Sequence, residues 1–226
     1  MVEPVLYRWP PNAAFGRTVP KTKFYEHGNV GAALREKFVN DVQRIIWGYK
    51  LGDDTVRLRG TTAVPEIQVF TVETKGVDVS DDVLAAIDRT VHFPIVFEVT
   101  GGDKVRTVAA QKTFGGKTPA VGAYYSAGWL SADAERQPLP TALDLPGLYE
   151  AILSALLPMD KRAGETVPEA IDRLDRARRL QREIAALERK LRTEPQLNRK
   201  IEYRRQISER TAVLTELTNP TPSNKE

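Results

Sequence analysis

The chain has 226 residues, 41% hydrophobic and 28% charged with a formal net charge of +3, a composition typical of globular domains. The absence of cysteine excludes disulfides and thiolate sites, and two histidines argue against a histidine-rich metal site. No apolar run reaches the roughly 18 residues of a membrane helix and the first residues lack a signal-peptide pattern, so we expect a cytoplasmic protein without membrane contact.

The first third of the chain predicts one helix followed by two strands. The segment before Val30 is rich in proline, glycine and aromatic residues, which favours loop or extended structure. Apolar residues then recur at helical spacing across residues 34–49, so we expect a single helix there. Gly52 and two aspartates end it, and residues 55–60 and 64–75 predict two strands joined by a turn.

The next elements carry clear local signals. We expect a helix at 81–91, a hairpin at 95–112, a strand at 119–129 and a helix at 145–158. Ser80 is a good N-cap for the first of these, and Gly101-Gly102-Asp103 is a strong hairpin turn. This order predicts an α/β (α+β) domain over residues 1–158, with a mixed, mostly antiparallel sheet covered by helices.

The character of the chain changes after residue 158. Residues 161–226 hold 16 Lys and Arg against 11 Asp and Glu, whereas residues 1–160 hold 17 against 19. Leucine and isoleucine recur at helical spacing on both sides of Thr193-Glu194-Pro195, the second stripe running through Leu197, Ile201, Ile207, Leu214 and Leu217. We therefore expect an antiparallel helical hairpin or coiled-coil arm over residues 159–218 and a disordered tail over 219–226.

One motif raises the possibility of catalysis. Glu73-Thr74-Lys75 is a Glu-x-Lys of the kind found in some metal-dependent nucleases, in which an Asp and the Glu hold Mg²⁺ and the Lys activates water. Pairing of the two predicted strands would bring Asp53 or Asp54 near Glu73. Since a short motif alone is weak support, we favour solvated charge at a strand end. Mg²⁺ is expected only for a nuclease, and no other cofactor or metal site is predicted.

Glu66 and Gln68 begin the same predicted strand, on a face that then turns apolar. A carboxylate at the edge of a buried face needs a basic partner or backbone donors. Lys50 is one available partner, and Lys21 and Lys23 are others. Two interpretations stay open, a structural ion pair and a small polar binding site.

Basic residues predict a possible contact with nucleic acid. Lys21 and Lys23 stand among aromatic residues, a combination that can grip a phosphate and stack a base. The first helix of the basic arm carries Arg173, Arg176, Arg178, Arg179 and Arg182 within less than three turns. Basic helices can follow a phosphate backbone. The alternatives are solvated lysines beside core aromatics, and an ordinary Arg/Glu helix that associates with a protein partner or a second copy.

Several motifs together point to a family. They are "FGRTVPKTKFYEH", "QRIIWGYKL", "VPEIQVFTVE", "IDRTVHFPIVFEV" and "RQPLPTALDLPGLYEAILSALLP". In this order they resemble domain-of-unknown-function family 4391, across residues 6–158 and into the helical arm. The resemblance implies a setting beside DNA methyltransferases and superfamily-two helicases, in loci like restriction or phage-defence systems. The family pattern matches Pro20-Lys21, Trp47, Lys50 and Glu66-Ile67-Gln68, but it assigns them no roles.

These observations lead to one expected function and two alternatives. We expect a non-enzymatic accessory subunit of a bacterial restriction-modification or anti-phage defence complex, docking on a helicase or DNA methyltransferase through the C-terminal helices. The first alternative is a restriction-endonuclease-like nuclease using Asp53 or Asp54, Glu73 and Lys75. The second is a non-catalytic nucleic-acid-binding module using lysines of the N-terminal segment and arginines of the arm, chiefly Arg178, Arg179 and Arg182.

Overall fold

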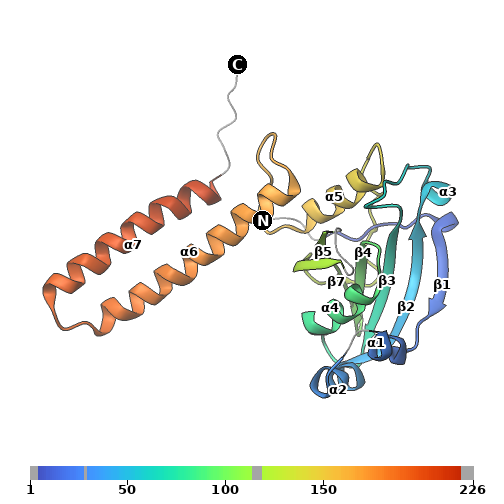
Figure 1. Cartoon of the computed structure of the whole chain (residues 1–226), viewed down its shortest axis with the longest axis horizontal. Helices are drawn as coiled ribbons and strands as arrows, with labels where there is room; N and C mark the ends of the chain where they lie inside the picture. The colour runs from blue at the N-terminus through green and yellow to red at the C-terminus, as the bar shows by residue number, and fades with distance from the viewer. Residues whose placement is uncertain (1–4, 28–29, 114–118, 220–226) are drawn as a thin grey trace. The chain divides into compact units, whose positions relative to one another are not determined.

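The computed structural model describes residues 5–27, 30–113 and 119–219 (Figure 1). The chain forms two compact units, Met1–Pro158 and Met159–Glu226. The first is an α/β unit and the second is a pair of long helices. Among the described residues, no helix combines the length and the apolar character that crossing a membrane requires.

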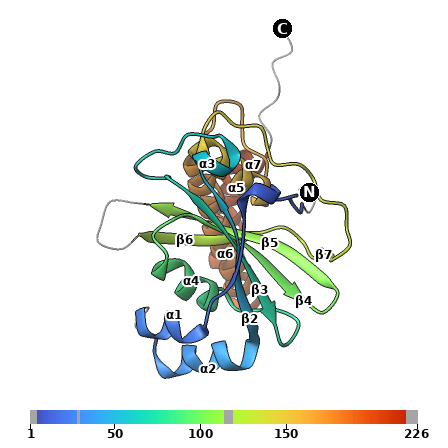
Figure 2. The same ribbon diagram turned by 90° about the vertical axis from the view of Figure 1, so that its right-hand side faces the viewer.

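The first unit is built on a sheet whose main strands follow the chain order (Figure 2). The strands are β1 (Ala14–Thr18), β2 (Val42–Leu51), β3 (Ile67–Thr74), β4 (Ile95–Gly101), β5 (Lys104–Thr113) and β6 (Ala120–Ser126), and the short β7 (Leu130–Ser131) pairs with β5. All neighbouring pairs are antiparallel except β3 and β4, which are parallel and connected through α4 (Asp81–Thr90). The predicted mixed, mostly antiparallel sheet is therefore confirmed.

Alternation along the strands builds one core on each face of the sheet. On β3, Phe70 and Val72 join the core that contains residues of α1 (Lys21–His27), α2 (Ala32–Asp41) and α4. Ile67 and Val69 join the other core, beneath α5 (Leu145–Leu156) and the N-terminal segment with the 3₁₀ turn η1 (Pro11–Ala13). Helices cover the sheet as expected.

The elements with strong local signals form where they were predicted. Helices α4 and α5, strand β6 and the β4–β5 hairpin all lie within or beside their expected ranges. The hairpin turn places Gly102 at a φ of 62°, a conformation that side-chain-bearing residues rarely adopt. Asp144 caps α5 by accepting a hydrogen bond from the Gly147 amide at 2.8 Å.

Three predictions for the first 60 residues are wrong. The expected helix over residues 34–49 ends at Asp41, and the chain continues as β2, because its aromatic and β-branched residues pair on both sides with β1 and β3. Residues 55–60 are not a strand, since the chain forms the short helix α3 (Asp53–Val56) and then a loop. The segment Lys21–His27, expected as loop, is helix α1, whose Phe24 packs into the core.

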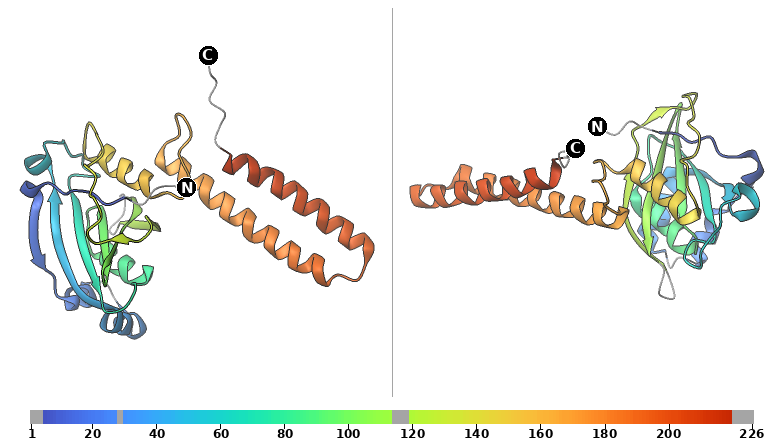
Figure 3. Two further views of the ribbon diagram at one scale, coloured as in Figure 1. Left: turned by 180° about the vertical axis from the view of Figure 1, so that it is seen from behind. Right: turned by 90° about the horizontal axis from the view of Figure 1, so that it is seen from above.

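The second unit is the predicted helical hairpin (Figure 3). Helix α6 (Val167–Thr193) and helix α7 (Leu197–Thr218) pack together, and an ion pair between Glu183 and Arg210 links them at 2.8 Å. Thr166 and Glu169 form a capping box at the start of α6. From residue 220 onward, the predicted disordered tail lies outside the described residues.

Candidate functional site

The predicted cluster at the start of β3 forms. Lys50 Nζ lies 2.7 Å from Glu66 Oε2, and Gln68 Nε2 donates a hydrogen bond to Glu66 Oε1 at 2.8 Å. Lys50 and Gln68 are register partners on β2 and β3. The Glu66 carboxylate raises the pKa of Lys50, first by its hydrogen bond and then by its charge. Since both Glu66 oxygens have partners, the geometry fits an ion pair that ties β2 to the start of β3.

Lys21 does not join this cluster. Its ammonium donates hydrogen bonds to the carbonyls of Phe38, at 3.2 Å, and Val42, at the opposite end of β2 from Lys50. Lys75 donates to the Val39 carbonyl at 2.7 Å. The two lysines thus satisfy carbonyls at the end of α2, where a positive charge also complements the helix dipole. Burial lowers the pKa of Lys21, and the nearby charge of Lys75 lowers it further. Lys23 remains exposed.

The predicted nuclease residues are not brought together. Arg44 holds the Glu73 carboxylate through two contacts, at 2.6 and 3.0 Å. The antiparallel neighbour of β3 is β2 rather than the expected strand at residues 55–60, and Arg44 pairs with Glu73 in the register. Asp53 and Asp54 follow the other end of β2, which lies seven residues or about 23 Å beyond Arg44 at roughly 3.3 Å per residue. In the described ranges, no group of three or more His, Cys, Asp or Glu side chains is placed to hold a metal ion.

Sequence reasoning missed the most deeply buried charges. The side chains of Lys112 and Asp88 are 0% and 1% exposed, and their charged atoms lie 2.7 Å apart. Lys112 also donates to the backbone carbonyls of Asp88, Val91 and Phe93, and Tyr124 donates to the second Asp88 oxygen at 2.9 Å. Burial raises the pKa of Asp88 and lowers that of Lys112. The cluster fastens the end of α4 to β5 and β6.

A second buried carboxylate lies on the opposite face of the sheet. Glu98 accepts hydrogen bonds from Trp9 Nε1 at 2.7 Å and from Arg136 at 2.6 Å. Arg136 also donates to the Tyr7 carbonyl at 2.8 Å. This network fixes the N-terminal segment across the sheet. The sequence signal for a buried carboxylate here is that Glu98 shares a face of β4 with Val96 and Thr100.

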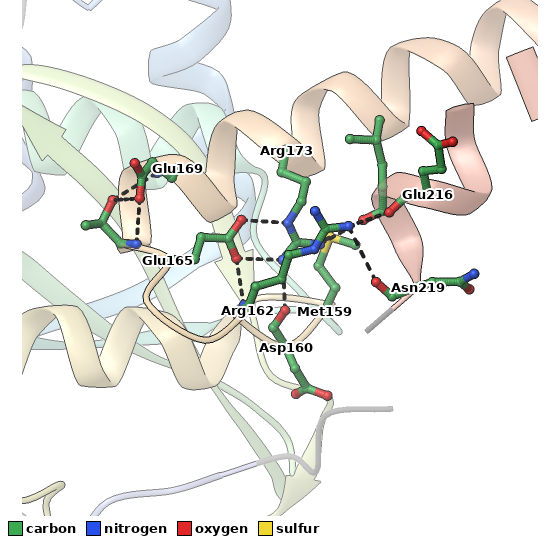
Figure 4. Close-up of polar contacts among 10 residues, drawn as sticks. Met159, Asp160, Arg162, Glu165, Glu169, Arg173, Glu216 and Asn219 are labelled. Atoms are coloured by element: carbon green, nitrogen blue, oxygen red, sulfur yellow. Dashed lines mark hydrogen bonds and ion pairs between the residues drawn. The ribbon is translucent and has the colours of Figure 1, made fainter. Parts of the chain in front are cut away.

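At the base of the hairpin, one arginine is fully engaged (Figure 4). Arg173 binds both oxygens of Glu165, at 2.7 and 2.8 Å, and donates to the carbonyls of Asp160 and Leu217, both at 2.9 Å. Arg162 contacts the carbonyl of Glu216 nearby. The hydrogen bonds from Arg173 lower the pKa of Glu165. These contacts hold the end of α7 against the start of α6.

The other arginines of α6 have different surroundings. Arg178 lies 3.9 Å from Asp175, at the limit of an ion pair. Arg176, Arg179 and Arg182 are exposed, and within the described part of the chain no carboxylate forms an ion pair with them. Arg176, Arg178, Arg179 and Arg182 line one hollow beside the end of α7.

The apolar stripe expected on α7 is split between two faces. Ile207, Leu214 and Leu217 are half-buried on the side that faces α6. Leu197 and Ile201, one turn apart near the start of the helix, are 68% and 56% exposed on the opposite side. The prediction of a single stripe is therefore wrong, because the two residues are about half a turn out of phase with the others. The hairpin presents two large apolar side chains to solvent.

These features define a mixed α/β domain with internally paired charges, followed by a basic helical hairpin. Residues 8–214 match the model of the family described as Domain of unknown function (DUF4391). The match covers most of the chain and includes residues of both units, so the chain belongs to this family. No curated protein and no solved structure matches it.

Proposed function

We propose that the chain is a non-enzymatic accessory subunit that docks on a protein partner through the hairpin tip, defined as residues 188–205. The observation that carries this proposal is the exposure of Leu197 and Ile201 on the outer face of α7. Each would bury its apolar surface at an interface, which contributes about 1.5–3 kcal/mol per side chain. Their spacing of four residues is that of anchors used when one helix packs on another.

The hairpin is suited to present this tip. Helix α6 has 27 residues and is about 40 Å long at 1.5 Å per residue. Arg173 and Glu165 fix its base, and Glu183 with Arg210 link the helices farther along. Such bracing lowers the entropy lost when the tip is bound. Two helices alone leave the outer face of α7 uncovered, and a partner helix would complete the layer.

The charge of the tip indicates what kind of partner fits. Residues 188–205 carry seven basic and three acidic side chains, a net charge of +4. The complementary surface is an amphipathic helix of another protein, apolar along one face and flanked by carboxylates. A second copy of the chain would bring an equal positive charge against the first, which disfavours pairing of two tips.

The biological setting extends the resemblance to the family. We place the subunit in the cytoplasm, in a restriction-modification or phage-defence complex, with a helicase or DNA methyltransferase as partner and the α/β unit as the recognition body. This function requires no Mg²⁺. The nuclease alternative is less favoured, because Arg44 neutralises Glu73 and the candidate aspartates follow the other end of β2.

The test compares two double variants of the full chain against a helicase or methyltransferase partner. L197E/I201E places two charges in the tip, whereas S208E/A212E places them on exposed positions of α7 at the same spacing outside it. We expect the tip variant to weaken binding at least 100-fold in sedimentation or interferometry, and the control less than threefold. Equal effects would overturn the proposal. So would a wild-type dimer that the tip variant converts to a monomer, because the occupant would then be a second copy.

A further inference from the structure

A row of arginines follows α6 on the side that lines the hollow. Arg176, Arg179 and Arg182 recur at three-residue steps and span about 9 Å along the helix axis. All three side chains are exposed. The hairpin tip lies beyond them, since it begins at residue 188, six residues or about 9 Å along the helix from Arg182.

The charges around the hollow leave this row with an excess of positive charge. Its lining comprises Arg173, Arg176, Arg178, Arg179, Arg182, Asp172, Asp175 and the apolar Leu217. Glu165 neutralises Arg173, and Asp175 lies beside Arg178. The remaining charges of the lining are the three arginines of the row and the single carboxylate of Asp172. A single apolar residue in the lining gives a partner little apolar surface to bury.

We propose that this row, which we call the arginine face, binds the phosphodiester backbone of a nucleic acid. Guanidinium groups form two parallel hydrogen bonds with phosphate oxygens, and they stay charged at every physiological pH. Protein interfaces have an apolar core, which the hollow lacks, whereas a phosphate backbone binds through charge and hydrogen bonds. Three arginines can neutralise two or three phosphates, so binding is independent of base sequence and sensitive to salt.

The experiment measures fluorescence anisotropy of a labelled 20-base-pair duplex and of a 20-nucleotide single strand with the full chain. Between 50 and 200 mM salt, we expect the logarithm of the binding constant to fall with a slope of roughly −2 to −3. The variant R176Q/R179Q/R182Q should bind at least tenfold more weakly than wild type at 50 mM salt. The matched control R189Q/K190Q/R192Q removes the same charge from exposed positions of the same helix and should lose less than threefold.

The comparison of the two DNA probes identifies the form of backbone that binds. Equal losses in both triple variants would overturn the arginine face, because diffuse positive charge would then explain binding. Absence of binding by wild type at 50 mM salt would overturn it as well, as would polyglutamate competing as strongly as DNA. R176K/R179K/R182K keeps the charge without the two-pronged geometry, and it should retain the salt slope while binding severalfold more weakly. Circular dichroism checks that each variant keeps its helices.

Discussion

The ion pair at the base of the hairpin gives the sharpest prediction about stability. Glu165 and Arg173 are 10% and 7% exposed and share two hydrogen bonds. Removing one partner of a buried pair costs about 3–5 kcal/mol. In E165Q the amide keeps one oxygen acceptor, and Arg173 keeps the Asp160 and Leu217 carbonyls. We therefore expect a loss of about 2 kcal/mol, or about 30-fold less protection from hydrogen exchange near the end of α7.

The pH dependence separates this pair from a general loss of packing. The folded-state pKa of Glu165 is lowered, so its contribution is fully present above the ordinary glutamate value of about 4.3 and is lost as the pH falls through the folded-state pKa. Wild type and E165Q should therefore differ at pH 7 and converge near pH 2, after correction for intrinsic exchange rates. E216Q, which alters an exposed carboxylate on α7, should match wild type at both pH values. A difference that persists undiminished at pH 2, or is absent at pH 7, would refute the reasoning.

The α/β unit yields two further predictions. K112M should destabilise this unit by about 3–5 kcal/mol in hydrogen exchange, because the buried Asp88 carboxyl and three backbone carbonyls would lose the ammonium that satisfies them. K104M alters an exposed lysine of the same strand and should cost little, and equal costs would contradict the structural role. K21M should raise hydrogen exchange in the last turn of α2 severalfold, since the ammonium caps helix carbonyls, and it should leave DNA binding unchanged. K23M, at an exposed position, should change neither hydrogen exchange nor DNA binding. A loss of DNA affinity in K21M would restore the phosphate-binding interpretation.

The parts of the fold that sequence predicted are those fixed by local chemistry. The β4–β5 hairpin depends on its Gly-Gly-Asp turn. Helix α4 starts after Ser80 as predicted and has two aspartates in its first turn, although the Ser80 side chain makes no capping hydrogen bond. The helical hairpin depends on a break at Glu194-Pro195 between two periodic stretches. In each case the deciding residues are neighbours in the chain.

The failures arise where distant residues decide. Residues 34–49 satisfy a helical period, yet Val42 and Ile45 are equally able to face the core from a strand. Pairing with β1 and β3 selects the strand, and that pairing involves segments far apart in sequence. A short apolar run fits both the 3.6-residue period of a helix and the two-residue period of a strand, so this ambiguity is expected.

The same distinction applies to the polar clusters. The pairing of Lys50 with Glu66 could be predicted from sequence, because Lys50 was expected at the end of a helix and Glu66 at the start of a strand of the hairpin that follows it. Asp88 and Lys112 could not be, because a helix end and a strand 24 residues apart meet only once the sheet has formed. Lys21 is the opposite case. In the sequence, a lysine among aromatic residues fits a phosphate-binding pattern. The sequence does not show that its ammonium is already hydrogen-bonded to a carbonyl at the end of α2.

The two proposed surfaces of the hairpin can act independently. Leu197 begins α7 just after the end of α6 at Thr193, which lies 14 residues or about 21 Å along α6 from Arg179 at the middle of the arginine face, and this distance exceeds the Debye length of about 8 Å at physiological ionic strength. Charge added at the tip is therefore largely screened at the arginine face. L197E/I201E should then leave DNA affinity within about twofold of wild type, and R176Q/R179Q/R182Q should leave partner affinity unchanged. If either variant impaired both activities, a single shared interface would replace the two surfaces.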